Sequence, residues 1–274
     1  MTYTGAATGA LYDGISTLYG TTISGGQYFT GTVFTVQPTR KLKPTDDWKE
    51  RPIYAFCAGH TPCKDGYFPG PLLVGSAGTL YGPVTLGGAN NEGAIFELTY
   101  NSASDAWSYQ LLYSFCALAN CADGSQPTGS LLLDGSGNLV GTTRDGGSIT
   151  SPNCSYDGCG VAFSVALNGT ETVTHKFCAL TSCPDGFSPV GGLVMDGSGN
   201  LFGSARYGGN SANGGTLFEL TGTSLNVLYD FCAQTTCHDG GGPECVIMDN
   251  SGSLFGATAY GGAHSEGTVF EWTP

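Results

Sequence analysis

Ten of the eleven cysteines stand in five short-range pairs, the first pattern in this sequence that could do chemistry. The pairs are Cys57 and Cys63, Cys116 and Cys121, Cys154 and Cys159, Cys178 and Cys183, and Cys232 and Cys237. Sulfurs five or six residues apart can close a local loop as a disulfide in an oxidising compartment, whereas the paired thiols of zinc sites usually stand closer together. We therefore expect five disulfides and a secreted protein, either extracellular or periplasmic. The eleventh, Cys245, directly precedes an apolar run and is expected to be a small buried thiol.

An aspartate stands two residues after the second cysteine of four pairs, each time followed by glycine. These residues are Asp65, Asp123, Asp185 and Asp239. Asp-Gly steps favour turns in which the carboxylate caps nearby N–H groups, so one interpretation is structural. Alternatively, carboxylates gathered around one axis would repel each other and bind a cation such as calcium. In an enzyme that cleaves glycosidic bonds, Asp123, Asp185 and Asp239 would be the candidate catalytic carboxylates.

A second polar set precedes the Gly-Gly pairs in the later part of the chain. Its members, with one histidine from a cysteine loop, are Arg144, Asp145, Arg206, Tyr207, His238 and Tyr260. Tyrosine stacks on sugar rings and arginine binds carboxylates with two parallel hydrogen bonds. We expect these residues to form a pocket for a sugar or a carboxylate, although solvated side chains are the simpler interpretation.

The elements that must position these residues come from a tandem repeat. One strand motif occurs five times, at 16–22, 78–84, 137–143, 199–205 and 252–258. A further strand follows each copy, at 31–36, 93–98, 160–165, 215–220 and 267–272. Four copies are preceded by an element that ends in Phe-Cys-Ala, a loop with Asp-Gly and a short apolar strand. The repeat is about 54–62 residues long and contains four short strands.

Four strands in a repeat of this length are typical of a propeller blade. The sequence therefore predicts an all-β fold, a five-bladed β-propeller with four-stranded blades that forms one domain over residues 1–274. The last copy ends after its third strand, and residues 1–4 precede the first apolar strand at 10–12. We expect this N-terminal strand to complete the last blade and close the ring. The cysteine loops and the Gly-Gly loops should then share one face of the propeller.

Residues 37–51 contain five of the nine basic residues and should lie on the opposite face. The five are Arg40, Lys41, Lys43, Lys49 and Arg51. Acidic residues alternate with them, which favours a solvated loop. A docking patch for an acidic surface is the alternative.

Four segments of the later repeats resemble a known family. They are DGSGNLFG at 196–203, YGG at 207–209 and 260–262, GGTLFEL at 214–220 and LYDFCA at 228–233. This combination resembles the GloVer-type tandem repeat (Gloeo-Verruco repeat) of secreted bacterial proteins, over nearly the whole chain. The resemblance implies export and a propeller-like array, and it transfers no activity or catalytic residues. The short loop at 5–9, the turn at 75–78 and the insertion at 148–159 depart from the repeat.

The composition excludes several classes of partner. A formal net charge of −13 with nine Lys and Arg argues against nucleic acid, because neutralising phosphates requires clustered basic residues. No apolar run approaches the length of a membrane span, so we expect no membrane insertion. Glycine accounts for 45 of 274 residues, which disfavours helices. We expect a monomer.

Three functions fit these features. The first is a secreted, disulfide-stapled, carbohydrate-binding (lectin-like) module whose blades present related loops on one face. The second is a glycoside-cleaving enzyme with carboxylates around the central channel. The third is a structural or adhesive surface component, and fold alone does not choose among them.

Overall fold

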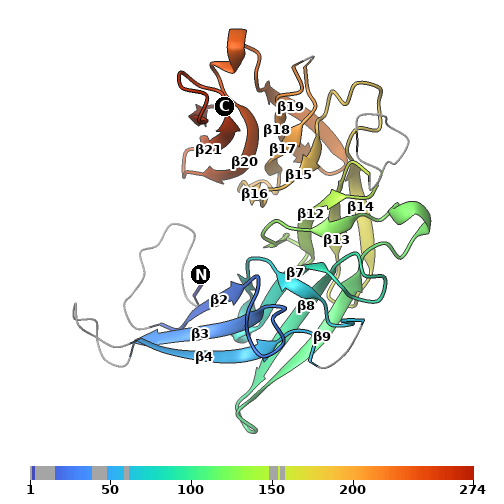
Figure 1. Cartoon of the computed structure of the whole chain (residues 1–274), viewed down its shortest axis with the longest axis vertical. Coiled ribbons are helices and arrows are strands. Elements are labelled where there is room, and N and C mark those ends of the chain that lie inside the picture. Colours follow the sequence, from blue (N-terminus) through green and yellow to red (C-terminus); the bar gives the residue numbers. More distant parts are fainter. Residues whose placement is uncertain are drawn as a thin grey trace. The chain divides into compact units, whose positions relative to one another are not determined.

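The computed structural model describes residues 2–3, 16–38, 48–58, 62–147, 154, 158–210 and 212–274 (Figure 1). The described part of the chain is all-β, with five antiparallel sheets. Its helical segments are three short 3-10 turns, at Ser76–Gly78, Ala119–Cys121 and Thr235–Cys237. The chain divides into two compact units, Met1–Ser114 and Phe115–Pro274.

The first unit contains two sheets. The first sheet has the order β1 (Thr2–Tyr3), β2 (Leu18–Thr22), β3 (Thr32–Pro38) and β4 (Trp48–Ala55). The second sheet contains β5 (Tyr67–Pro69), β6 (Leu73–Val74), β7 (Leu80–Leu86), β8 (Ala94–Asn101) and β9 (Ala106–Ser114). Both β5 and β6 pair with β7.

The second unit contains three sheets. The third sheet contains β10 (Ser125–Pro127), β11 (Leu132–Leu133), β12 (Leu139–Asp145), β13 (Val161–Val165) and β14 (Glu171–Lys176). The fourth contains β15 (Phe187–Pro189), β16 (Val194–Met195), β17 (Leu201–Tyr207), β18 (Thr216–Thr221) and β19 (Ser224–Asp230). The fifth contains β20 (Gly241–Met248), β21 (Leu254–Tyr260) and β22 (Val269–Trp272).

The two strand motifs pair with each other because a glycine makes room for a phenylalanine. Gly141 lies directly opposite Phe163, and a Cβ on Gly141 would come 2.8 Å from the Phe163 ring. Gly203 and Phe218 repeat this arrangement, with 2.7 Å to the ring. The predicted second and third strands of each repeat are therefore confirmed, with shifts of a few residues at their ends.

The phenylalanine of each Phe-Cys-Ala segment packs on the next sheet. Phe177 is fully buried, and its ring lies 5.2 Å from that of Phe218 in the following sheet. Phe231 packs in the same way against Phe270, at 4.9 Å. Within the second unit, these contacts form a separate hydrophobic cluster between each pair of successive sheets, one around Phe177 and Phe218 and another around Phe231 and Phe270.

The first strand of the repeat, predicted as one short apolar strand after the Asp-Gly loop, consists of two pieces in the second, third and fourth sheets. Each first piece ends at a proline, namely Pro69, Pro127 and Pro189, which cannot donate a backbone hydrogen bond to the next strand. The residue before each proline has a positive φ, for example 55° at Gln126. The chain therefore bends away from the ladder and returns four or five residues later as a second short piece.

Two predictions about single segments are wrong. The N-terminal strand does not complete the last sheet, because Thr2–Tyr3 pairs with Leu18 and Tyr19 of its own sheet, in the register of β6 on β7. The predicted apolar strand at 10–12 lies outside the described residues. Cys245 is exposed rather than buried. The register of β20 on β21 shifts between Pro243 and Cys245, so that Glu244 and Cys245 both face outward.

In the second to fifth sheets, the disulfide loop and the Gly-Gly loop meet at one end of the sheet, as predicted. In these four sheets, the second glycine of the Gly-Gly pair donates its N–H to the carbonyl of the second cysteine in the disulfide loop, for example Gly209 to Cys183 at 2.9 Å. The first glycine has no room for a side chain, because a Cβ on Gly208 would lie 2.7 Å from the Cα of Gly186. This end of each sheet, here called the disulfide-loop end, carries the predicted site residues.

Candidate functional site

All five predicted disulfides are present, as Cys57–Cys63, Cys116–Cys121, Cys154–Cys159, Cys178–Cys183 and Cys232–Cys237. They join cysteines whose Cα atoms lie between 3.9 Å and 5.2 Å apart. Disulfides of this number persist in oxidising compartments, which indicates a secreted or extracellular protein.

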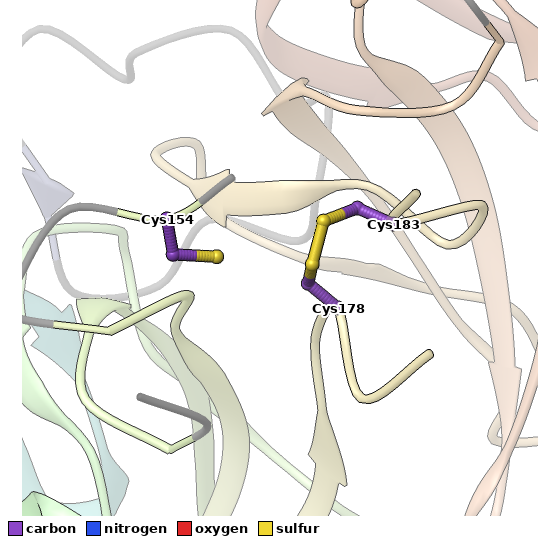
Figure 2. A group of neighbouring side chains, drawn as sticks. All are labelled: Cys154, Cys178 and Cys183. Carbon is purple, nitrogen blue, oxygen red and sulfur yellow. A yellow bond between two sulfur atoms is a disulfide. The ribbon is translucent and has the colours of Figure 1, made fainter. Parts of the chain in front are cut away.

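Two of the disulfides lie side by side in the second unit. Figure 2 shows the sulfur of Cys154 next to the Cys178–Cys183 disulfide, and the three sulfur atoms lie within 4.8 Å of one another. Metals bind cysteine as the thiolate. Because all three sulfurs are bonded in disulfides, the group is a structural crosslink and offers no thiolate.

Each aspartate of the disulfide loops caps its own loop. Asp123 is fully buried, and its Oδ2 and Oδ1 accept the N–H groups of Ala117 and Leu118 at 2.8 Å and 3.1 Å. Asp65 accepts the N–H of Cys57 at 2.9 Å, and Asp239 accepts two N–H groups of its own loop. The contacts match the turn-capping interpretation of the Asp-Gly step.

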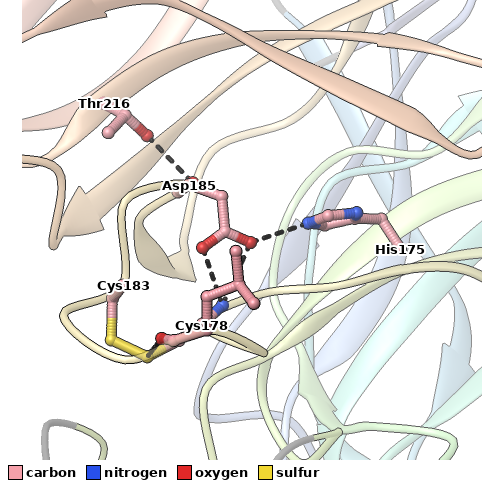
Figure 3. Close-up of polar contacts among 6 residues, drawn as sticks. His175, Cys178, Cys183, Asp185 and Thr216 are labelled. Atoms are coloured by element: carbon pink, nitrogen blue, oxygen red, sulfur yellow. Dashed lines mark hydrogen bonds and ion pairs between the residues drawn. A yellow bond between two sulfur atoms is a disulfide. The ribbon is translucent and has the colours of Figure 1, made fainter.

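A side chain from the preceding fourth strand donates to the same carboxylates. The hydroxyls of Tyr54 and Tyr229 lie 2.9 Å from Asp65 and Asp239 respectively. In the third repeat, His175 takes the place of the tyrosine, with Nε2 at 2.9 Å from the carboxylate of Asp185 (Figure 3). The fourth strand is therefore tied to the loop that leads into the next sheet.

These hydrogen bonds shift the proton affinities of the groups involved. Burial raises the pKa of Tyr229, and the hydrogen bond to the Asp239 carboxylate raises it further, to about 12. Burial alone would raise the pKa of Asp239, but the hydrogen bonds from Tyr229 and from the N–H groups of Gln234 and Ala233 outweigh it and lower that pKa. Asp239 is therefore held as a carboxylate.

Within the second unit, the described carboxylates of Asp123, Asp185 and Asp239 do not form a common group of metal ligands. Among the described residues, the group of three or more potential metal ligands is formed by cysteine sulfurs and includes none of Asp123, Asp185 and Asp239. Each of these carboxylates is directed instead at backbone N–H groups of its own loop.

Part of the predicted ligand-binding set does come together, at the disulfide-loop end of the fourth and fifth sheets. The guanidinium of Arg206 lies 5.9 Å from the centre of the Tyr207 ring and 3.2 Å from Glu244. Burial raises the pKa of Tyr260, Tyr207 adds to this effect and the charge of Arg206 opposes it, so Tyr260 lies within electrostatic reach of both groups.

Both tyrosines of this cluster present a ring to solvent. Tyr207 is 37% exposed and Tyr260 38% exposed. The ring of Tyr260 packs against Gly241, where a Cβ would come 2.4 Å from it. Tyr207 packs against Phe187 at 5.3 Å. The rings are therefore held in place from below while their outer surfaces remain accessible.

The other members of the predicted set are engaged elsewhere. Arg144 forms an ion pair with the buried carboxylate of Asp145 at 3.0 Å and donates to Gln126. His238 lies beside Asp239 in a pocket of about 340 Å³ at the β19 and β22 edges, together with aromatic residues of the fifth sheet. The predicted six-residue pocket is therefore reduced to the cluster of Arg206, Tyr207 and Tyr260.

Sequence reasoning missed two features. The first is a pocket of about 290 Å³ in the first unit, lined by Trp107, Tyr100 and the bases Lys49 and Arg51. The long segments at 37–51 and 99–107, which the other repeats lack, were the available signal. The second is Glu171, whose pKa is raised to about 7 by burial and by the charge of Asp123, against the opposing charge of Lys176.

Comparison with known families decides the assignment of the chain. The Gloeobacter/Verrucomicrobia repeat matches residues 2–181 and, in a second overlapping copy, residues 149–274. The chain belongs to the Gloeobacter/Verrucomicrobia repeat family. The resemblance expected from the motifs at 196–233 is thereby confirmed. No curated protein has detectable sequence similarity to this repeat protein.

Several solved structures resemble this family member in fold. The extracellular domain of a protein described as a one-component system from B. thetaiotaomicron has a TM-score of 0.52 and 11% identity, over 89% of this chain and 25% of that one. A gluconolactonase from Xanthomonas campestris has a TM-score of 0.46 and 13% identity, over 88% and 65%. A Trypanosoma rangeli sialidase has a TM-score of 0.48 and 10% identity, over 88% and 39%.

The likeness to these structures concerns the fold alone. The first of them, with a TM-score of 0.52, shares its arrangement of elements with most of the repeat protein. The chain spans a quarter of the length of the first of them. Within the described residues, the repeat protein has no helix that is long and apolar enough to cross a membrane.

Proposed function

We propose that this repeat protein is an extracellular carbohydrate-binding module whose five sheets are the blades of a closed β-propeller. The ligand is a saccharide that stacks on exposed tyrosine rings at the disulfide-loop end of the second unit.

The cluster of Arg206, Tyr207 and Tyr260 carries this proposal. Exposed aromatic rings, fixed from below by glycine or phenylalanine, offer flat apolar surfaces that suit the C–H face of a sugar ring. Arg206 adds fixed donors for hydroxyl or carboxylate oxygens beside the rings. The equivalent loops of the first two repeats carry Ile23 and Thr85 in place of the arginine, so the combination is specific to the later repeats.

We assign the loop aspartates a structural role and therefore favour binding over bond cleavage. A general acid or a nucleophile must be free to contact the substrate. The carboxylate of Asp123 is fully buried and accepts two backbone N–H groups, and the carboxylate of Asp239 accepts three hydrogen bonds. Both carboxylates are thus occupied by the loops that they stabilise.

The fifth sheet carries an exposed apolar side chain at a position that is buried in the other sheets, and a closed ring would cover it. Val269 is 85% exposed, whereas the residues at the same place in the other sheets are 0–1% exposed. These residues are Val33, Ile95, Ala162 and Leu217. In the fourth sheet this face is covered by the fifth, since Leu217 packs in one cluster with Val246 and Phe270. A ring provides the same cover for Val269.

The test is a glycan array probed with the disulfide-intact protein and with two variants. We expect binding to a subset of saccharides, and loss of at least about tenfold in affinity for Tyr260→Ala and Tyr207→Ala. Leu167→Ala is the matched control, because Leu167 is 44% exposed and lies in the β13–β14 turn at the opposite end of the third sheet.

The same samples are assayed for release of reducing ends from mixed polysaccharides. The proposal expects none. Turnover that disappears in Asp185→Asn while the melting temperature is unchanged would favour an enzyme, and silence in both assays would favour a structural surface component.

A further inference from the structure

The pocket in the first unit has the dimensions of a small ligand site. Its volume is about 290 Å³, close to the lower end of the roughly 300–1,000 Å³ typical of ligand pockets. Aromatic and basic side chains line it, among them Tyr19, Lys49, Arg51, Tyr100 and Trp107.

One face of the first sheet forms the floor of the pocket. Tyr19, Thr35 and Arg51 lie opposite one another on β2, β3 and β4. Gln37 and Lys49 form the next row on the same face, because side chains two residues apart along a strand point the same way. The register of three strands therefore places two cations beside a tyrosine ring.

An extended hairpin of the second sheet forms the wall. Tyr100 and Trp107 lie directly opposite each other on β8 and β9, with ring centres 5.4 Å apart. Trp107 meets Tyr19 of the floor edge to face, at 6.2 Å and 76°. Three aromatic rings thus lie in contact around the pocket.

The pocket lies where two departures from the repeat meet. The β8 and β9 strands have 8 and 9 residues, whereas the equivalent strands β13 and β14 have 5 and 6. Tyr100 and Trp107 lie in the added length of the β8–β9 hairpin. Lys49 and Arg51 belong to the basic segment of the first repeat. The remaining repeats carry neither feature.

The charge of the pocket is opposite to that of the chain. The protein has a net charge of −13 and nine basic residues, of which two line this pocket. Arg51 is held at the rim by Asp105 at 3.5 Å, and Tyr100 donates to the same carboxylate at 2.7 Å. Among the described residues, Lys49 has no ion-pair partner and is available to a ligand anion.

We propose that this pocket binds an anionic saccharide and that its preferred ligand is a carboxylated sugar, a uronic acid unit of a polysaccharide. The Trp107 and Tyr100 rings take the apolar face of the sugar, and Lys49 with Arg51 takes the carboxylate. Gln37 supplies an amide for a hydroxyl group. This second site is separate from the cluster of Arg206, Tyr207 and Tyr260 and does not depend on it.

The test is a titration followed by tryptophan fluorescence, with an oligogalacturonide, a sulfated oligosaccharide and a neutral oligosaccharide of equal length. We expect the oligogalacturonide to bind about tenfold or more tightly than the neutral probe, and its affinity to fall as salt is raised. Tighter binding of the sulfated probe would overturn the carboxylate assignment. Equal binding of all three probes, or none, would overturn the proposal.

Variants locate the binding. Lys49→Met removes the charge and keeps the stem, and we expect about fivefold weaker binding of the oligogalacturonide with unchanged binding of the neutral probe. Lys64→Met is the matched control, since Lys64 is exposed and outside the pocket. Trp107→Phe, which keeps a ring, should weaken binding less than Trp107→Ala. For both variants, binding is measured by calorimetry and folding by circular dichroism. Unchanged affinity in Lys49→Met would contradict the proposal.

Tyr260→Ala separates this site from the proposed function. The variant should bind the oligogalacturonide at the first unit with the affinity of the wild type. If the array finds no ligand for the tyrosine cluster while Lys49→Met still weakens oligogalacturonide binding, the proposed function fails and this inference stands.

Discussion

Removal of the Asp123 carboxylate should destabilise the protein far more than removal of an exposed turn aspartate. In Asp123→Ala, the N–H groups of Ala117 and Leu118 lose a charged acceptor at a fully buried position. Hydrogen bonds to charged groups contribute about 1.5–3 kcal/mol each, so the expected loss is about 3–6 kcal/mol. At roughly 2–4 °C per kcal/mol for a unit of this size, the melting temperature should fall by at least about 6 °C.

Asp134→Ala is the matched control for this prediction. Asp134 also accepts two backbone N–H groups, from Ser136 and Asn138, both at 2.8 Å, but at a partly exposed turn where water replaces the lost acceptor. Its expected cost is about 1 kcal/mol. Calorimetry of the two variants under non-reducing conditions measures the difference. Equal melting temperatures for the two variants would refute a structural role for the loop aspartate.

Three further predictions concern other parts of the fold. The folded-state pKa of Glu171 is raised to about 7 from 4.5, so the contribution of this group to stability is present below about pH 4.5 and is lost as the pH rises through 7. Glu171→Gln should therefore be more stable than wild type by about 1–2 kcal/mol at pH 8, a value that allows for the partial exposure of the side chain. A stability difference that stays constant from about pH 4 to pH 8 in urea titrations would count against this prediction. His175→Tyr should keep the wild-type urea midpoint, since tyrosine donates to the loop aspartate in two other repeats, whereas His175→Phe should lose about 1 kcal/mol; equal midpoints for both variants would show that the contact to Asp185 adds nothing. Val269→Ser should cost at least about 1.5 kcal/mol if the ring closes over it, and a change below about 0.5 kcal/mol in thermal melts would show an open face.

Local patterns in the sequence were sufficient to predict the strands and the crosslinks. The glycine and phenylalanine that face each other in neighbouring strands recur in every repeat, as Gly141 and Phe163 illustrate, so the pairing could be found by comparing the chain with itself. The cysteine pairs are close in sequence, and a loop of five or six residues leaves few alternatives for pairing. The Asp-Gly step predicted the capping contacts of Asp123 for the same local reason.

Features that depend on register or on departures from the repeat were not predicted. Cys245 is exposed because β20 shifts its register by one residue, and a one-residue shift reverses the face of a strand. Thr2–Tyr3 pairs with β2, since two residues suffice for a short ladder. The sequence did not predict this pairing, because the apolar pattern placed the first strand of that repeat at 10–12. The aromatic contact of Tyr19 with Trp107 joins two repeats, and the residue pattern of neither repeat predicts it.

Only part of the predicted ligand-binding set is brought together, and the binding itself stays a prediction. Arg206 and Tyr207 lie at the end of β17 and Tyr260 at the end of β21, in successive sheets, and both strands end at the disulfide-loop end. Arg144 occupies the same place in the third repeat as Arg206 in the fourth, but the buried carboxylate of Asp145 holds it in an ion pair. The place of a residue in the repeat therefore predicts where its side chain lies better than it predicts which group that side chain contacts.

The central claim is that saccharides bind to exposed aromatic rings of this protein. Chemical-shift mapping by nuclear magnetic resonance tests it most directly, with isotope-labelled, disulfide-intact protein titrated with the best saccharide from the array. The account predicts shifts that saturate and centre on the backbone amides of Arg206, Tyr207 and Gly261. Saturating shifts confined to strands remote from these amides and from the pocket at Trp107, or no shifts at millimolar saccharide, would contradict it.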